Sequence, residues 1–338
     1  MTSYYAGLDV GDTETAVCVT DAAATVLFEG RLRSDAKTVA SCLRPYKKML
    51  QGVGIETGAT ASRLYKQLWR QRYPMICLDA FHAHSALRAQ RNKTDRADAK
   101  GLALLLCRGM YREAHVKSDE ALAVRFLLNA RATLVRRSLD IRLTILSAAK
   151  LFGFTTDLKG KRVQRIQWSR RARSATASDA ANALLRSEHM LAAEVKAIDA
   201  MLAKMARSDP VCRRLMTMPG VGVLTALTFK AAIDDPARFQ SSRTVGAHFG
   251  LTTRRHQSGA IDIGGRISKR GDSRVRQALY LAAAAMLAKS KKESRLRNWG
   301  LALRERHGFR FAAVACARRM AVILHRMWVT ETDFDPAR

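Results

Sequence analysis

The sequence predicts an α/β domain with a mixed sheet, then a helical coiled-coil middle, then a mainly α-helical C-terminal domain. Residues 4–32 contain three strand-like apolar runs, and helix and strand patterns then alternate to about residue 117. Apolar residues recur every seven positions in the middle of the chain, and long apolar helical patterns follow Pro210. We therefore expect domains over residues 1–117, 118–207 and 208–338.

The N-terminal elements follow from local patterns. The runs "YYAGLDVG", "ETAVCVT" and "TVLFEGRL" are separated by the turn signals "DVGDT" and "TDAAA", which is typical of consecutive strands. A helix is expected near 36–43, a buried strand at "VGIET", a helix at "ASRLYKQLWRQ" and a strand at "MICLDA". A further apolar helix is expected to begin near Asp95.

Two heptad segments define the middle region. Their core positions are Leu127, Leu134, Ile141 and Ala148, then Leu184, Leu191, Ile198 and Met205. They indicate either a coiled-coil arm, formed as a hairpin or as a dimer contact, or an ordinary amphipathic helix pair. Between them lies a basic segment without acids, which we interpret as a nucleic-acid contact or as a solvated basic face. Its candidate residues are Lys161, Arg162, Arg165, Trp168, Arg170, Arg171 and Arg173.

The C-terminal region begins with a glycine turn before an apolar helix. In "MPGVGVLTALTFKAAI", Gly220 and Gly222 would leave backbone N–H groups free at a helix N-terminus, as in a helix-hairpin-helix DNA-binding turn. A glycine-rich, basic and flexible stretch follows from "RRHQSG", and it carries the basic candidates Lys269 and Arg270. A long apolar helix is then expected from about Ser273, and a last one over 311–328.

Composition points to a polyanionic partner. The 338 residues include 59 Lys and Arg against 29 acids, a net charge of +30. Nucleic acid is the expected partner, and an anionic membrane surface is the alternative. The chain contains no long apolar run and opens without a signal peptide, so we expect a cytoplasmic protein without a membrane partner. The six cysteines form no CxxC pair, which indicates reduced core residues. In "FHAHSAL", His82 and His84 would share one face of a strand, which leaves a metal pair or incidental surface histidines.

Four carboxylates form a pattern, and two of them end buried strands, where acids are costly. Asp9 ends the first apolar strand and Glu56 ends a later one, whereas Asp95 and Asp98 lie three apart on one helix face. A pair of Mg²⁺ ions would bind such oxygens, and two ions can clamp a phosphodiester. This order of acids is the ribonuclease H-like (RuvC-like) layout. Helix capping is an alternative for the helix acids, but it does not explain Asp9 or Glu56.

The motifs also resemble a known family. "GLDVG", "GIETGAT" and "NKTDRADAKGLA", followed by "MPGVGVLTA", "HFGLTTRRHQSG" and "GRISKRGDSRVRQALYLAA", resemble DEDD-type transposases of bacterial insertion sequences. These are the bridge-RNA-guided serine recombinases of mobile elements. The resemblance covers about residues 4–110 and 209–290, it departs at none of the four acids, and the middle region shares only its helical character.

The resemblance implies a function and a set of roles. Asp9, Glu56, Asp95 and Asp98 would bind magnesium, and Ser258 would be the nucleophile that forms a phosphoserine link to DNA. It further implies dimers or tetramers that join the acids of one subunit to the serine of another. The partners would be donor and target double-stranded DNA and a noncoding guide RNA, in a bacterial, nucleoid-associated protein.

The residues around Ser258 are compatible with this role. A serine flanked by glycine on a basic loop can reach a phosphate, and Arg254 and Arg255 could neutralise it. Taken without the resemblance, Ser258 reads as a plain turn residue, and His256 as either a proton carrier or an incidental loop histidine.

Three other functions remain open from the sequence. One is a junction-resolving hydrolytic nuclease, of the kind that acts on Holliday junctions, which uses the same acids without a serine step. Another is an actin-like or sugar-kinase-like ATPase, because "LDVGDTETAV" fits its first phosphate loop. The third is a non-catalytic nucleic-acid-binding protein.

Overall fold

The computed structural model describes the chain except residues 1–2, 59, 88–93, 153–173, 260 and 338. It divides into two compact units, residues 1–117 and 118–338. The basic candidates between Lys161 and Arg173 lie outside the described residues. Among the helices that are described, none is long and apolar enough to cross a membrane.

The first unit is built on one mixed five-stranded sheet in the order β3-β2-β1-β4-β5. Strand β1 pairs antiparallel with β2 and parallel with β4, while β3 is antiparallel to β2 and β5 is parallel to β4. The strands are β1 Tyr4–Val10, β2 Glu14–Asp21, β3 Val26–Arg33, β4 Leu50–Glu56 and β5 Met75–Leu78. This sheet confirms the ribonuclease H-like fold predicted from the acids and the strand runs.

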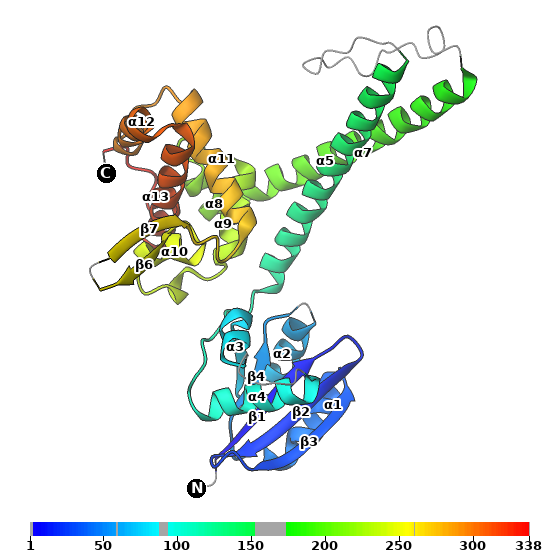
Figure 1. The fold of residues 1–338 in the computed structure, drawn as a ribbon, viewed down its shortest axis with the longest axis vertical. Coiled ribbons are helices and arrows are strands. Elements are labelled where there is room, and N and C mark those ends of the chain that lie inside the picture. Colours follow the sequence, from blue (N-terminus) through cyan, green and yellow to red (C-terminus); the bar gives the residue numbers. More distant parts are fainter. Residues whose placement is uncertain (1–2, 59, 88–93, 153–173, 260, 338) are drawn as a thin grey trace. The chain divides into compact units, whose positions relative to one another are not determined.

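Helices cover both faces of the sheet (Figure 1). On one face, α1 (Ala36–Leu43) and α2 (Ala61–Arg70) bury Val39 and Leu64 in one core with Leu8 of β1. On the other face lies α4 (Asp95–Cys107), whose Leu102 and Leu106 share a second cluster with Leu78 of β5. A 3₁₀ turn at Arg44–Tyr46 follows α1.

The segment with His82 and His84 corrects one expectation. It forms helix α3 (Ala80–Leu87) rather than a strand, and both histidines are exposed. Residues two apart on a helix point in different directions, so they do not form a metal pair. The residues at this position are therefore best interpreted as surface histidines.

Helix α4 approaches β1 unusually closely at Gly7. A Cβ atom at Gly7 would lie 2.0 Å from the carbonyl oxygen of Ala99 and 2.6 Å from the backbone nitrogen of Ala103. Only a residue without a side chain fits between strand and helix here. Gly7 therefore sets how near the first turns of α4 come to the sheet.

The two long helices of the middle region pair with each other. Helix α5 (Asp119–Leu151) and helix α7 (Ala175–Ser208) run antiparallel, since Arg131 contacts Asp199 near one end whereas Ile145 packs with Ala181 near the other. Buried Glu188 accepts hydrogen bonds from Ser138 (3.0 Å) and Arg142 (2.7 Å). The heptads thus form a hairpin within one chain.

This helix pair shares its core with the C-terminal helices. Ala121 and Val124 of α5 and Leu202 and Ala206 of α7 are buried in the same cluster as the C-terminal helices. That cluster includes Met320 and Leu324 of α13 (Phe309–Val329), which starts two residues earlier than the sequence indicated. The other elements are α8 Pro210–Leu215, α9 Val223–Ile233, α10 Val245–His248, α11 Ser273–Lys289 and α12 Arg295–His307, with 3₁₀ turns at Pro236–Arg238 and Ser242–Thr244.

The expected flexible stretch after residue 252 is instead a β-hairpin. Strands β6 (Thr253–Ser258) and β7 (Ile261–Ile267) pair antiparallel. The chain then enters α11, where Asp272 caps the helix and binds Arg125 of α5 at 2.6 Å. Burial opposes ionisation of Asp272, but the hydrogen bond from Arg125 and the backbone N–H groups of α11 hold its pKa below the ordinary value. The base of the hairpin is therefore anchored to the helical core.

Replacement of Gly7 by Ala should destabilise the first unit. The new methyl group would meet backbone atoms of α4 that cannot rotate away, an overpacking cost of about 1–3 kcal/mol. Urea unfolding followed by circular dichroism would measure it. Gly58→Ala is the matched control, because its Cβ would meet only the Ala61 side chain at 3.6 Å. Equal stability of the two variants would show that α4 can move away from β1 at little cost.

Candidate active site

Asp9 and Glu56 are brought together at the carboxyl ends of adjacent parallel strands. Leu8 of β1 pairs with Ile55 of β4, so the next residues are Asp9 and Glu56. Side chains alternate along a strand, and Gly7 and Gly54, two residues earlier, both face α4. Asp9 and Glu56 therefore point to the α4 side of the sheet, and both are half-buried.

The first turn of α4 lies at this same end of the sheet. Cys107, at the other end of α4, contacts the carbonyl oxygens of Asp21 and Ala22, whereas Ala99 packs on Ala16. Ala16 is the β2 partner of Asp9. Helix α4 thus runs antiparallel to β1, and its first-turn acids Asp95 and Asp98 come to the Asp9 end.

Helix capping at this turn does not require either aspartate. The cap is Thr94, whose hydroxyl accepts a 3.1 Å hydrogen bond from the N–H of Ala97. Asp95 and Asp98 follow in the first turn, where negative charge is favourable. Because Thr94 provides the cap, neither aspartate is needed for it, and the aspartate side chains remain available for another role.

Two arginine contacts tie this turn to β3. Arg31, which pairs with Ala16 in register, binds Asp95 at 3.1 Å, and Arg96 binds Glu29 at 2.5 Å. The hydrogen bond from Arg96 holds the pKa of Glu29 below its ordinary value. Sequence reasoning missed Arg31 and Glu29, although their spacing of two in the strand "VLFEGRLR" places them on one face.

The Arg31–Asp95 pair is weak enough to be exchanged. The side chains are 57% and 65% exposed, and such pairs contribute about 0–1 kcal/mol. A guanidinium at this position shows that the Asp95 carboxylate already attracts a cation. A divalent ion that binds several carboxylates at once would compete with it effectively.

The donor set fits magnesium by type. Carboxylate oxygens are the ligands that hard divalent cations prefer, and Asp9, Glu56, Asp95 and Asp98 supply them from two strands and one helix. Within the described ranges, however, no three His, Cys, Asp or Glu residues are already grouped closely enough to hold a metal. Beneath the turn, Cys18 packs on Ala99, and burial with help from Glu29 raises the pKa of Cys18 to about 11, so its thiol stays neutral. The candidate ligands are therefore oxygens alone.

Ser258 lies at the tip of the β6–β7 hairpin. It is the last residue of β6, pairs with Ile261, and is exposed. Gly259 follows with a φ of +57°, a left-handed conformation that glycine adopts without strain, and its chain neighbours aside, no atom of the described residues lies within 4 Å of its Cβ position. The serine hydroxyl is accordingly accessible to a large ligand.

The neighbouring arginines are placed differently from one another. Arg255 binds Asp262 at 2.7 Å, and Asp262 pairs with Gln257, so this ion pair occupies the hairpin face opposite Ser258. The hydrogen bond from Arg255 lowers the pKa of Asp262. Arg254 donates to the carbonyl of Ser268 at 3.2 Å. Lys269 and Arg270 are exposed at the base of the hairpin.

The two turn glycines before α9 also have separate roles. Gly220 has a φ of +86°, and a Cβ there would lie 2.2 Å from the carbonyl oxygen of Ala282 in α11. It is thus a packing residue. Gly222 is the exposed N-cap of α9, without a side-chain cap and with open space around it. Both glycines are exposed, so both stay candidates for a backbone contact, but only Gly222 has open space around its Cβ position.

Comparison with known proteins agrees with this arrangement. A model of the DEDD transposases of IS110 type matches residues 6–148, which include all four carboxylates. A model described as the transposase IS116/IS110/IS902 family matches residues 212–298, which include Gly222 and Ser258. The chain belongs to the IS110 family of insertion-sequence transposases.

Individual transposases support the assignment along most of the chain. It is 27% identical over 331 residues to the transposase for insertion sequence element IS1111A of Coxiella burnetii. This match covers 94% of this chain and 87% of that protein. It is 28% identical over 256 residues to a probable family 20 transposase of Pseudomonas aeruginosa, covering 72% and 75%. A 144-residue match of 32% identity links it to the IS1328 transposase of Yersinia enterocolitica, covering 42% of each. Transposases of this family cut and rejoin DNA.

Magnesium should stabilise the transposase through these carboxylates. Four acids at one end of a sheet repel one another, so a cation that binds only the folded state should raise the melting temperature. The Asp9→Asn variant should lose much of this increase, as measured by differential scanning fluorimetry with and without Mg²⁺. Asp12→Asn, an exposed acid just beyond β1, is the control. An identical magnesium response in Asp9→Asn and wild type would remove Asp9 from the metal site.

Proposed function

We propose that this transposase cleaves and rejoins DNA through a covalent phosphoserine at Ser258, with Asp9, Glu56, Asp95 and Asp98 as magnesium ligands. The observation that supports the proposal most strongly is the convergence of Asp9, Glu56 and the first turn of α4 at one end of the ribonuclease H-like sheet. An exposed serine on an anchored hairpin provides the second component.

The proposed reaction is a phosphoryl transfer in two balanced steps. The Ser258 oxygen attacks a DNA phosphate, loses its proton, and forms an O–P bond, while the bond from phosphorus to one sugar oxygen breaks and that oxygen leaves as a hydroxyl. A hydroxyl of another DNA end then attacks the same phosphorus and releases the serine. Bound Mg²⁺ would supply positive charge near the oxyanion of each transition state.

The chain's own residues would bind and orient the phosphate. Lys269 and Arg270, at the base of the hairpin, can contact the DNA backbone, and Arg254 lies in the same strand as the serine. Arg255 is better assigned to holding the hairpin together, because Asp262 binds it on the opposite face. Ile261 and Ile263 are each 61% exposed in β7, which gives the hairpin an apolar contact surface as well.

A guide RNA and a multi-subunit assembly complete the proposal. Both rest on the family resemblance, and the net charge of +30 favours polyanionic partners. The basic residues from Lys161 to Arg173 remain the candidate RNA contacts in the middle region. The carboxylates belong to the first unit and Ser258 to the second, so a site shared between subunits would use a different unit from each.

Removal of the serine hydroxyl tests the covalent step. Ser258→Ala should bind DNA and magnesium like wild type, because the side chain is exposed at the hairpin tip, but it should form no protein–DNA adduct. Denaturing gel electrophoresis of reactions with labelled donor DNA would detect the adduct. Ser268→Ala, at the base of the same hairpin, is the control and should keep it.

The competing function is a hydrolytic nuclease that uses only the carboxylates. In that case Ser258→Ala would still cut DNA, and wild type would give free ends without an adduct. Either result would refute the serine step while leaving the carboxylate site intact. Asp9→Asn should abolish cleavage under both mechanisms.

A shared site predicts rescue between two inactive variants. Mixed Asp9→Asn and Ser258→Ala proteins should form some assemblies that join an intact carboxylate site to an intact serine, and recombination should return in part. The rescue should peak near equal amounts and be measured with a plasmid recombination substrate. No activity at any ratio, with both variants shown to co-assemble, would place the whole site within one chain.

A further inference from the structure

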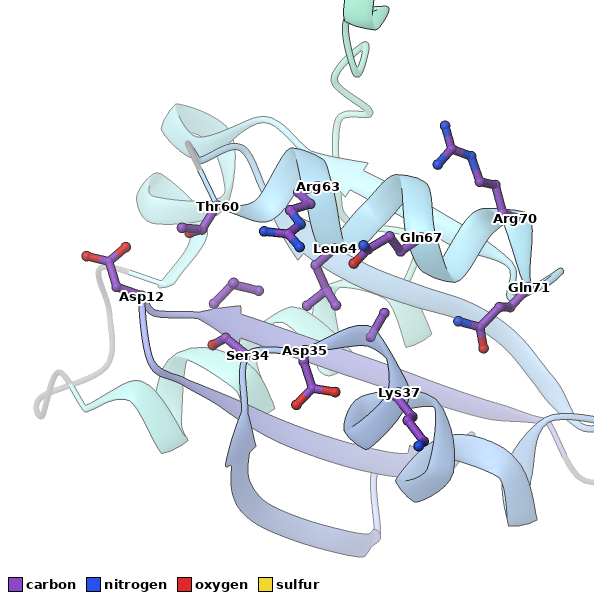
Figure 2. Close-up of a pocket in the computed structure, with 12 residues that line it drawn as sticks. Asp12, Ser34, Asp35, Lys37, Thr60, Arg63, Leu64, Gln67, Arg70 and Gln71 are labelled. Atoms are coloured by element: carbon purple, nitrogen blue, oxygen red, sulfur yellow. The ribbon is translucent and has the colours of Figure 1, made fainter.

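A groove follows α2 on the sheet face opposite the carboxylates. Its first part is a cavity of about 750 Å³ lined by Asp12, Ser34, Lys37, Thr60, Arg63 and Gln67, among others. Figure 2 shows Arg63, Leu64 and Gln67 of α2 on one side of this cavity, with Ser34, Asp35 and Lys37 across from them. Val10 also lines it, so the groove begins beside Asp9 but on the other face of β1.

The groove continues past the end of α2. A second cavity, of about 720 Å³, is lined by Lys47, Trp69, Arg70, Arg72 and Tyr73. Arg70 lines both cavities, so the two adjoin near the C-terminal end of α2. We call this groove the α2 track, defined by Lys37, Arg63, Gln67, Trp69, Arg70 and Arg72.

The α2 track carries mostly positive charge. Lys37, Lys47, Arg63, Arg70 and Arg72 line it, against the acids Asp12 and Asp35. Asp35 is already engaged as the cap of α1, because it accepts from the backbone N–H (2.9 Å) and the hydroxyl (2.8 Å) of Thr38. The remaining charge favours an anionic ligand that extends along the helix.

An exposed aromatic ring lines the second, basic cavity, where the α2 helix ends. Trp69 is 62% exposed on α2. The cationic residues beside it already make this surface soluble, so solubility does not require a tryptophan here. Nearby, the Lys47 ammonium lies 4.7 Å from the centre of the Tyr73 ring and donates to the carbonyl of Gln71 at 2.9 Å. The Tyr73 ring is therefore covered by Lys47, whereas the Trp69 ring is open to an incoming planar group.

We propose that the α2 track binds single-stranded nucleic acid, with a base stacked on Trp69 and the backbone held by Arg63 and Arg70. A concave basic path with an exposed tryptophan is the arrangement that single strands use, because their bases are free to stack. In a duplex the bases stack on one another and cannot reach Trp69. Gln67, between the two arginines, adds an amide that can bond to a base edge.

This inference rests on the proposed function only in that the transposase acts on nucleic acid. It does not depend on the serine step or on magnesium. Two sources of the strand share the required chemistry, an unpaired RNA segment and a DNA strand released by cleavage. The affinities for oligouridylate and for oligothymidylate of equal length distinguish these two sources, because the first represents RNA and the second represents DNA.

The test measures binding of these two fluorescent oligonucleotides and of a DNA duplex to the full chain by anisotropy. Asp9→Asn serves as background so that nothing is cut. Trp69→Ala should weaken single-strand binding by about fivefold or more, as expected for one lost stacking contact, and leave duplex binding unchanged. The double variant Arg63→Gln/Arg70→Gln should make the plot of log affinity for the single strand against log salt concentration less steep. The slope should fall in magnitude by about 0.7 per lost phosphate contact.

Matched controls come from the same unit. Phe81→Ala removes an aromatic ring that is 60% exposed on α3, and Arg108→Gln/Arg112→Gln removes two exposed arginines elsewhere. Neither should change single-strand affinity beyond a general charge effect. Photocrosslinking of thiouridine oligonucleotides should label the peptide that spans residues 61–73.

Three outcomes would overturn the α2 track. They are unchanged single-strand affinity in Trp69→Ala, an equal loss of single-strand and duplex binding, or crosslinks confined to other peptides. The Ser258 adduct assay distinguishes the two proposals, because a failed track with a normal adduct leaves the recombination mechanism intact. A working track with no adduct would leave the single-strand site intact.

Discussion

The close approach of α4 to β1 at Gly7 is the constraint on which the carboxylate site depends. With the Ala99 carbonyl only 2.0 Å from where a side chain would begin, helix and strand make backbone contact. This contact fixes the height of the first turn of α4 above the sheet. Asp95 and Asp98 come to the Asp9 end of the sheet because of it, and Arg31 and Arg96 form exposed ion pairs between that turn and β3.

The sequence predicted the first unit well because its signals are local. Alternating apolar residues and turn signals placed β1, β2 and β3, and the acids Asp9 and Glu56 at the ends of buried strands lie at the edge of the sheet where α4 begins. Other features depend on contacts between distant segments. The Arg31–Asp95 pair spans sixty-four positions, and the packing of Gly220 on Ala282 depends on how α9 and α11 meet.

One misjudged segment shows how local patterns can mislead, and one correctly predicted helix shows what they leave out. Glycines and basic residues made the stretch around Ser258 read as flexible, yet alternation in "TRRHQS" and "IDIGGRI" sufficed for two strands. The α2 track escaped notice because "ASRLYKQLWRQ" looks like an ordinary amphipathic helix. Its polar face became informative only once α1 and the β4–β5 side of the sheet enclosed it.

The β6–β7 hairpin has a consequence for how the Ser258 segment can vary in length. Successive strand residues face opposite sides, so a shift of one residue in pairing would carry Ser258 to the face where Arg255 and Asp262 now meet. The ion pair opposes such slippage, since it forms in one register only. Insertions or deletions within β6 would therefore preserve the orientation of the serine when they come in twos, and reverse it when they come singly.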